Sequence, residues 1–395
     1  MRRSRSATTL LVASAVLATS LTGCDLGSAT SEAGEIVVGA DLELSGAGAV
    51  AGKAYQRALE LRSEEINKSG QLGGRKIRLV VKDNRSDPTE SLRNIGEFTG
   101  DNSVNAIVMG GCGDCAIGAA KTINDKRVPT IALASASAVA SPTADRRYLF
   151  KLAPNATDSA AALTTELRRK DIKKVGLLVT DDSYGRDGLT AMTSELAKAN
   201  IKLPRPAQTI KPTDTELSDR VGEVIDGKPA ALVVWAPTEP TLAAAAAAQA
   251  AGFQGPLYFD SSAAGDLFLP AEAAKAVNNA TMVFTQTMVI DDVIATTPAK
   301  AARKQWFRDY TARYGGYHGY SSFAADALQL VVDAVVKAGG TSGAGSRDAV
   351  RDIMETTQFD GLSGPIRMTP DNHSGLMPQA LTTLVARGGR WRLSG

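Results

Sequence analysis

Residues 35–88 read EIVVGADLELSGAGAVAGKAYQRALELRSEEINKSGQLGGRKIRLVVKDNRSDP, and their alternation indicates the fold class. Residues 36–39 are apolar or small without alternation, which is typical of a strand buried on both faces of a parallel sheet. Residues 45–52 contain three glycines and three alanines, so a small molecule can approach the backbone there. An apolar helical stripe follows at 55–66, and residues 76–82 form a second predicted strand. The stretch therefore predicts strand, glycine-rich loop, helix, turn and strand.

The same alternation continues along the chain, at spacings typical of a parallel α/β sheet. The tail, residues 359–374 and 381–393, has the pattern of a returning β-hairpin. The segments predicted to be strands are 104–109, 128–133, 148–152, 174–180, 230–235, 257–259 and 281–285, and helices are predicted at 116–123, 160–167, 184–199, 241–251 and 323–336.

The N-terminus has the features of an export signal. It begins MRRSRS, continues with an apolar run at 10–17 and reaches Leu21-Thr22-Gly23-Cys24. The apolar run is shorter than the about 20 residues that span a bilayer, so a secretory signal is favoured over a membrane helix. The last four residues match the lipobox pattern, which predicts cleavage before Cys24 and lipidation of its thiol. An ordinary signal peptide with an incidental cysteine is the alternative.

Composition and charge narrow the class of protein further. The chain has 395 residues, of which 44% are hydrophobic, so it can bury at least two cores. Residues 1–23 contain three arginines and no acidic residue, so their removal changes the formal net charge from +2 to −1. A near-neutral chain without a basic run gives no electrostatic basis for binding nucleic acid. We expect an exported protein, anchored by lipid to the outer face of the cell membrane.

Residues 66–88, INKSGQLGGRKIRLVVKDNRSDP, closely resemble the opening of bacterial solute-binding proteins of the leucine/isoleucine/valine-binding type. These proteins are the extracytoplasmic receptors of ABC importers. Residues 361–367 are similar to the usual ending of that family, so the resemblance runs from about 36 to 391. It implies a type I periplasmic binding protein: an α/β fold with two Rossmann-like lobes, parallel sheets and a hinge of three crossings. The implied boundaries are a signal peptide at 1–23, a flexible tether at 24–35, a first lobe of 36–153 and 286–357, and a second lobe of 154–285 and 358–395.

Residues 108–116, VMGGCGDCA, allow three interpretations. The first is a dinucleotide-binding site, because the glycines mimic its fingerprint. The next strand offers no acid to hold a ribose, so we reject this interpretation. Cys112 and Cys115 also mimic a thioredoxin-type redox pair at a helix N-terminus. The third interpretation is a disulfide that stiffens a ligand-contacting loop, since a lipidated Cys24 leaves these two cysteines as a pair in an oxidising compartment.

The resemblance implies where ligand is held. The family often has a hydroxyl-rich loop at Gly113 and Asp114, where this chain instead has an acid. Asp114 either caps the following helix or faces the ligand, and the sequence leaves both open. Tyr184 matches a tyrosine that closes over ligand from the second lobe, although it also fits an aromatic packed at the start of a helix. Asp260 is the candidate for pairing with an α-ammonium group, while Ser261 is in closer register.

The remaining contacts implied by the resemblance are hydroxyl groups near the carboxyl ends of strands, where open α/β sheets bind ligands. Either of two serines after the strand at 128–133 fits the family pattern, because the register slips by one residue. The complete set of candidate ligand-binding residues is Ser45, Gly113, Asp114, Ser135, Ser137, Tyr184, Thr238, Asp260 and Ser261.

Motifs for catalysis and for metal binding are absent from the sequence. Neither His318 nor His373 has a partner at metal-ligand spacing, and we expect both histidines at the surface. There is no G-x-S-x-G motif and no phosphate-cradling lysine motif. We therefore expect no catalytic residue, metal or cofactor, and a binding protein that delivers a small polar solute, most often an amino acid in that family, to an ABC permease. The alternatives are a ligand sensor for a membrane partner and an exported thiol-disulfide oxidoreductase that uses Cys112 and Cys115.

Overall fold

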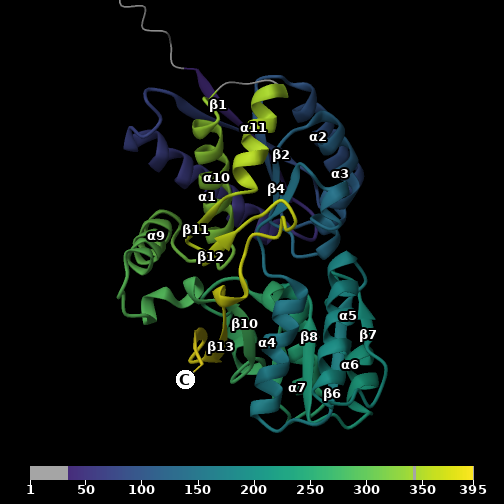
Figure 1. Ribbon diagram of the computed structural model, residues 1–395. Helices are drawn as coiled ribbons and strands as arrows, with labels where there is room; N and C mark the ends of the chain where they lie inside the picture. The colour runs from purple at the N-terminus through teal and green to yellow at the C-terminus, as the bar shows by residue number, and fades with distance from the viewer. Residues whose placement is uncertain (1–33, 341–343, 395) are drawn as a thin grey trace, which may run out of the picture.

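A computed structural model describes residues 34–340 and 344–394. The predicted signal peptide, Cys24 and nearly all of the predicted tether lie outside these residues. The described chain forms two lobes, each built around its own sheet and covered by helices (Figure 1). This arrangement confirms the two-lobed α/β class predicted from the sequence. Within the described ranges, no helix combines the length and the apolar character needed to cross a membrane.

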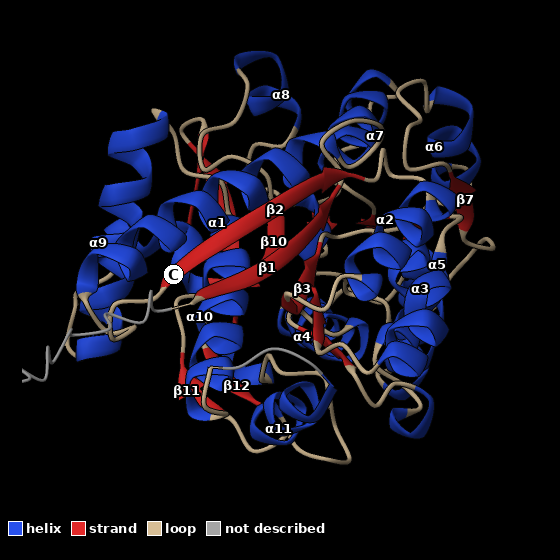
Figure 2. Cartoon of the chain, turned by 90° about the horizontal axis from the view of Figure 1, so that it is seen from above, coloured by secondary structure: helices blue, strands red, loops and turns tan. Residues whose placement is uncertain are grey.

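The first lobe is organised around five parallel strands in the order β2-β1-β3-β4-β5. Strand β1 lies inside the sheet between β2 and β3, and all but its first residue are buried. Successive side chains of β1 point to opposite faces of the sheet. Ile36 and Val38 pack toward α1 and α10 (Ser321–Lys337), and Val37 packs toward α2 and α3. Figure 2 shows these helix pairs on opposite sides of the sheet. The elements are β1 (Glu35–Leu42), α1 (Ala49–Ser69), β2 (Lys76–Asp83), α2 (Pro88–Gly100), β3 (Val104–Met109), α3 (Gly113–Lys126), β4 (Thr130–Ala132) and β5 (Leu149–Lys151).

The second lobe contains a sheet in the order β14-β13-β10-β9-β8-β6-β7. Its strands are parallel except at one end, where β13 runs antiparallel to β10 and β14 antiparallel to β13. A C-terminal hairpin is therefore present within residues 381–393, whereas the other predicted part, residues 359–374, lies outside this sheet. The elements are α4 (Ala156–Arg169), β6 (Val175–Thr180), α5 (Ser183–Lys198), β7 (Gln208–Ile210), α6 (Ser218–Ile225), β8 (Ala231–Trp235), α7 (Thr238–Ala250), β9 (Leu257–Phe259), α8 (Ala271–Ala276), β10 (Thr281–Thr285), β13 (Leu381–Arg387) and β14 (Arg390–Leu393).

The C-terminal third of the chain returns to the first lobe before it ends in the second. Asp326 of α10 accepts hydrogen bonds from the N–H groups of Leu362 and Ser363, both at 2.7 Å, and so holds the small β11–β12 hairpin. The N–H of Gly375 donates to the carbonyl oxygen of Lys151 in β5 at 2.9 Å. The elements are α9 (Pro298–Tyr314), α10 (Ser321–Lys337), α11 (Ala344–Met354), β11 (Gln358–Asp360) and β12 (Pro365–Arg367), with short 3-10 helices at Ser137–Val139, Thr143–Asp145, Ser261–Ala263, Gln286–Asp292 and Pro378–Ala380.

This path requires three passages of the chain between the two sheet regions, after β5, after β10 and after β12. The segment at 358–377 contacts α10 and β5, so it lies against the first lobe. The residue boundaries of the lobes given above stay a prediction.

Candidate functional site

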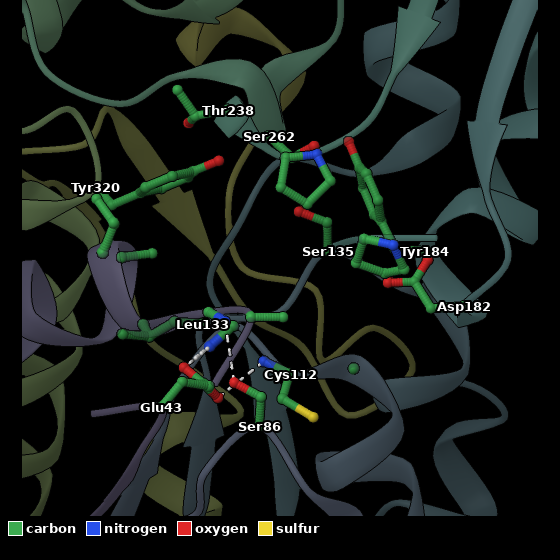
Figure 3. Close-up of a pocket in the computed structure, with 18 of the residues that line it drawn as sticks. Glu43, Ser86, Cys112, Leu133, Ser135, Asp182, Tyr184, Thr238, Ser262 and Tyr320 are labelled. Carbon is green, nitrogen blue, oxygen red and sulfur yellow. Dashed lines mark hydrogen bonds between the residues drawn. The ribbon is translucent and has the colours of Figure 1, made fainter. Parts of the chain in front are cut away.

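A cavity of about 340 Å³ lies between the two lobes, within the range typical of small-molecule sites. Its walls come from the carboxyl ends of strands and from the N-termini of α1, α3, α5 and α7, as expected for ligand sites in open α/β sheets. Figure 3 shows side chains of both lobes converging on it. The polar and aromatic lining comprises Glu43, Tyr55, Ser86, Cys112, Asp114, Ser135, Asp182, Tyr184, Thr238, Glu239, Ser262, His318 and Tyr320.

Glu43 follows β1 and occupies the floor of the cavity in the first lobe. Its side chain is buried, and its two carboxylate oxygens accept from the N–H groups of Gly111 and Cys112, each at 3.0 Å (Figure 3). Burial raises the pKa of Glu43, and the two backbone hydrogen bonds oppose that rise. The backbone N–H groups in the loop between β3 and α3 are therefore already hydrogen-bonded to the side chain of Glu43.

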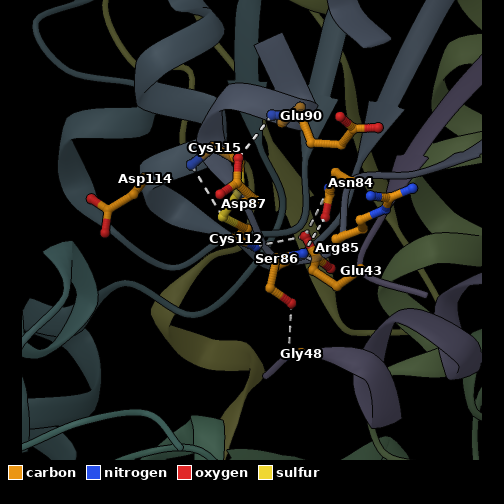
Figure 4. The surroundings of a disulfide bond; sticks show 12 residues. Glu43, Gly48, Asn84, Arg85, Ser86, Asp87, Glu90, Cys112, Asp114 and Cys115 are labelled. Atoms are coloured by element: carbon orange, nitrogen blue, oxygen red, sulfur yellow. Dashed lines mark hydrogen bonds between the residues drawn. A yellow bond between two sulfur atoms is a disulfide. The ribbon is translucent and has the colours of Figure 1, made fainter. Parts of the chain in front are cut away.

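Cys112 and Cys115 are joined by a disulfide at the start of α3 (Figure 4). The sulfur of Cys112 also accepts from the N–H of Cys115 at 3.1 Å, which caps the helix. Cys115 is buried, whereas Cys112 lines the cavity. The helix cap is therefore a sulfur atom and not the carboxylate of Asp114.

Asp114 lines the cavity and reaches across to the second lobe. Its carboxylate accepts from the N–H of Ser183 at 3.4 Å and lies 3.6 Å from the guanidinium group of Arg186, both in α5. The two interpretations left open by the sequence were a helix cap and a ligand contact. The structure favours the cavity over the cap and adds a contact between lobes that the sequence did not predict.

In the second lobe, Asp182 and Tyr184 stand at the start of α5. Asp182 caps this helix, because one of its oxygens accepts from the N–H of Gly185 at 2.9 Å and from the hydroxyl of Thr180 at 2.8 Å. Burial raises the pKa of Asp182, and the neighbouring charge of Asp114 raises it further. The ring of Tyr184 lies 5.7 Å from that of Trp235, so this tyrosine both packs on the lobe and lines the cavity.

The start of α10 completes the cavity with Tyr320 and His318. The hydroxyl of Tyr320 donates to the carbonyl oxygen of Ser261 at 3.1 Å, and its ring lies 5.9 Å from that of Tyr55. His318 is buried, and burial lowers its pKa to about 4, so its ring is neutral near pH 7.

The prediction that both histidines lie at the surface is wrong. His318 and His373 are 6% and 1% exposed. His373 stacks on Phe150 with ring centroids 4.0 Å apart, and its Nε2 lies 3.2 Å from a carboxylate oxygen of Glu355. The polar and glycine-rich segments around the two residues suggested exposure, but packing against distant parts of the chain buries them.

The predicted ligand-binding residues divide into two groups. Five of them line the cavity: Gly113, Asp114, Ser135, Tyr184 and Thr238. The other four, Ser45, Ser137, Asp260 and Ser261, do not line it.

The four residues outside the lining have other partners. The hydroxyl of Ser45 donates to Asp83 at 2.7 Å at the surface, and the N–H of Ser137 donates to Asp187. Asp260 is fully buried, and it accepts from the N–H of Ser262 at 2.8 Å. Burial raises the pKa of Asp260 to about 8. The partly buried Ser262 in the same loop lines the cavity instead.

Sequence reasoning missed several lining residues, namely Glu43, Tyr55, Asp182, Glu239, His318 and Tyr320. Two of these acids had a signal that could have found them, because each lies within two residues of a predicted contact: Glu239 follows Thr238, and Asp182 lies two residues before Tyr184. Tyr55 belongs to the predicted apolar stripe of α1, so the sequence indicated a residue of the core and not one that lines the cavity. Tyr320 comes from a part of the chain that only tertiary folding brings to the cavity.

Comparisons with known proteins agree with this geometry. The model of the family described as periplasmic binding protein matches residues 35–389. Among curated proteins, an amino acid binding protein of Pseudomonas aeruginosa is 24% identical over 182 residues, which cover 45% of this chain and 47% of that protein. The chain therefore spans about half the length of this curated relative.

Solved structures resemble nearly the whole described chain. An extracellular ligand-binding receptor from Rhodopseudomonas palustris HaA2 has a TM-score of 0.81 at 23% identity and covers 91% of this chain and 99% of its own. A leucine-binding protein from Thermotoga maritima MSB8 has a TM-score of 0.77 at 16% identity, with coverages of 91% and 98%. A solute-binding protein of an ABC transporter from Rhodopseudomonas palustris BisB5, in complex with 3,4-dihydroxybenzoic acid, has a TM-score of 0.77 at 19% identity, with coverages of 90% and 95%. At these identities the likeness establishes the fold alone.

Proposed function

This chain belongs to the periplasmic binding protein family, and we propose that it captures a small polar solute between its two lobes and delivers it to an ABC importer. The observation that carries the proposal is the cavity itself, which is lined from both lobes by residues at the carboxyl ends of strands. No bond needs to be made or broken in this role.

Contacts between the lobes support a closure step. Asp114 of the first lobe contacts Ser183 and Arg186 of the second, and the N–H of Ser137 donates to Asp187 of α5. Few groups make these contacts, and a ligand in the cavity adds further ones that exist only when the lobes are together. A ligand therefore shifts the equilibrium toward the closed form to the extent that it binds the closed form more tightly than the open form.

Thermal unfolding of the exported chain, measured against a library, tests the capture step. The library contains the natural amino acids, small amides, polyamines and aromatic acids such as 3,4-dihydroxybenzoate. A ligand at about 100 times its Kd stabilises the protein by roughly 2.7 kcal/mol, which is visible as a rise in Tm. Small-angle scattering should show a smaller radius of gyration with the same compound.

Matched tyrosine variants separate binding in the cavity from general stability. Tyr184→Ala removes a side chain that lines the cavity, and we expect it to weaken the ligand found in the screen. Tyr314→Ala removes a half-buried ring outside the lining and should leave affinity unchanged. Equal affinities for both variants, or no stabilising compound in the library, would count against capture in this cavity.

The remaining parts of the proposal concern the anchor and the loop. We propose that Cys24 carries lipid that holds the protein at the outer face of the membrane. We also propose that the Cys112–Cys115 disulfide forms in the exported protein and fixes the start of α3 beside the ligand. Uptake of the identified solute should fail in cells that lack this chain and return when it is restored, which tests delivery to the permease.

A further inference from the structure

Among the described residues, the cavity lining contains acidic side chains and no side chain that is positively charged near pH 7, because His318 is neutral there. Glu43, Asp114, Asp182 and Glu239 contribute carboxylates, and no lysine or arginine is among the described residues that line it. Two of these acids come from each lobe. A ligand that carries a carboxylate would therefore meet like charge and find no guanidinium or ammonium partner.

The backbone groups best suited to hold an anion are already occupied by the chain. The N–H groups of Gly111 and Cys112 donate to Glu43. Three of the helices that point at the cavity carry an acid at their N-terminus: Asp114 lies in the first turn of α3, Asp182 caps α5, and Glu239 lies in the first turn of α7. These carboxylates complement the positive ends of the helix dipoles, so little of that positive potential is left for a ligand.

The positive groups near the cavity do not change this balance. Arg186 pairs with Asp114 at 3.6 Å and donates to the carbonyl oxygen of Asp181 at 2.6 Å. Lys151 is buried behind the lining and donates to the carbonyl oxygen of Ser135 at 3.2 Å. The N-terminus of α1 has no acidic residue in its first turn, but a helix terminus carries only about half an elementary charge. The four acidic side chains outnumber it, and Asp114 and Glu239 carry most of the negative charge because burial raises the pKa of Glu43 and of Asp182.

Aromatic side chains give the cavity a second means of holding a cation. Tyr55, Tyr184 and Tyr320 all line it, and Figure 3 shows Tyr184 and Tyr320 on opposite sides. Aromatic faces attract cations within about 6 Å of the ring centroid. Tyr184 is only 8% exposed, and its hydroxyl has no hydrogen-bond partner within the described part of the chain. A ligand group that donates or accepts a hydrogen bond could supply the missing partner, so the cation preference rests on the acidic side chains and the aromatic faces.

We propose that the solute is an organic cation, with an ammonium, amidinium or guanidinium group and no carboxylate. The inference rests on the proposed function, because it assigns the chemistry of the ligand to the same cavity. It departs from the amino acid expected from the sequence resemblance, since the lining offers acidic partners for the amino group but no lysine or arginine for the carboxylate.

Matched sets of three compounds test this assignment by titration calorimetry on the exported chain. Each set contains an amino acid, the amine that lacks its carboxylate and the acid that has hydrogen in place of its α-amino group. Suitable sets are leucine, 3-methylbutylamine and 4-methylpentanoate; tyrosine, tyramine and 3-(4-hydroxyphenyl)propanoate; and arginine, agmatine and 5-guanidinopentanoate. We expect an amine to bind at least about tenfold more tightly than its amino acid, and no acid to bind. Affinity for the amine should fall as salt is added.

Two matched variants test the charge itself. Glu239→Gln removes one negative charge from the exposed rim of the cavity, and we expect a two- to fivefold loss of amine affinity, roughly the effect of an exposed charge pair. Glu272→Gln is the control, because Glu272 is also exposed, also two residues after a proline and also in the first turn of a helix, but outside the cavity. The control should bind like the wild type.

The outcomes separate the two proposals. Tighter binding of an acid or an amino acid than of its amine would overturn the cation assignment and leave solute capture standing. Failure of every amine to bind would also overturn the assignment, while capture would still be decided by the wider library. Equal effects of Glu239→Gln and Glu272→Gln would show that charge in the cavity does not select the ligand.

Discussion

The buried carboxyl group of Asp260 makes a sharp prediction about stability and pH. Asp260 is fully buried after β9, and burial raises its pKa from 3.8 to about 8. The folded protein therefore holds this proton over a pH range in which the unfolded chain has released it. Because the folded state binds more protons, the free energy of unfolding falls as pH rises from about 4 to about 8. Above that range the penalty is constant.

Asp260→Asn should remove this pH-dependent loss. An asparagine can still accept through its side-chain oxygen from the N–H of Ser262, which Asp260 accepts at 2.8 Å. Each pH unit between the two pKa values changes the free energy of unfolding by about 1.4 kcal/mol. Between about pH 5 and pH 7.5, the wild type should therefore lose roughly 3 kcal/mol relative to the variant.

Urea unfolding of both proteins at the two pH values measures this difference. The exposed Asp219 in the first turn of α6 provides the control. Asp219→Asn should change the free energy of unfolding by the same amount at both pH values. An equal pH dependence in the wild type and in Asp260→Asn would refute the argument and show that Asp260 is ionised in the folded protein. The same variant also bears on ligand binding: unchanged affinity would agree with its position outside the cavity lining.

Three further predictions concern the anchor, the disulfide and the β11–β12 hairpin. Cys24→Ser should abolish lipidation. If the variant still partitions into detergent like the wild type, the lipid anchor is contradicted. Thiol titration of the exported protein without Cys24 should find no free thiol, and two free thiols would exclude the Cys112–Cys115 disulfide. Asp326→Ala leaves two backbone N–H groups and a hydroxyl without their acceptor, so it should cost roughly 2–5 kcal/mol in urea unfolding. The exposed Asp333→Ala on the same helix should change stability by less than about 0.5 kcal/mol.

Much of the fold could be predicted because its central strands are buried on both faces. The apolar runs at 104–109, 257–259 and 281–285 are found as β3, β9 and β10 with the predicted bounds. A short continuous apolar run is typical of a strand that is buried on both faces of a parallel sheet, so these strands could be predicted from the sequence. Strand β7 and helix α6, in contrast, were not predicted. Strand β7 has three residues at the edge of its sheet, and only the last of them is buried, so it carries no apolar run to detect.

The site was predicted less well, because its charges arise from tertiary structure. The resemblance identified the loops that reach the cavity, and five of the nine candidate residues line it. In the loop after β9, Asp260 turns into the core and Ser262 faces the cavity instead. The partners of Glu43 are backbone groups distant in the sequence, and no local pattern reveals them. The resemblance therefore indicated which loops reach the cavity, while the acidic character of the cavity became visible only in the assembled structure.

The positions of Asp114 and Asp182 connect the charge of the ligand with closure of the lobes. Asp114 belongs to the first lobe and Asp182 to the second, and their charges interact, since Asp114 raises the pKa of Asp182. Bringing the lobes together therefore costs electrostatic free energy unless a positive charge lies nearby. Arg186 supplies part of that charge from the side facing solvent. If the solute is a cation, it supplies the rest from inside the cavity, and its binding stabilises the closed form more than the open one. A carboxylate in the same place would oppose closure.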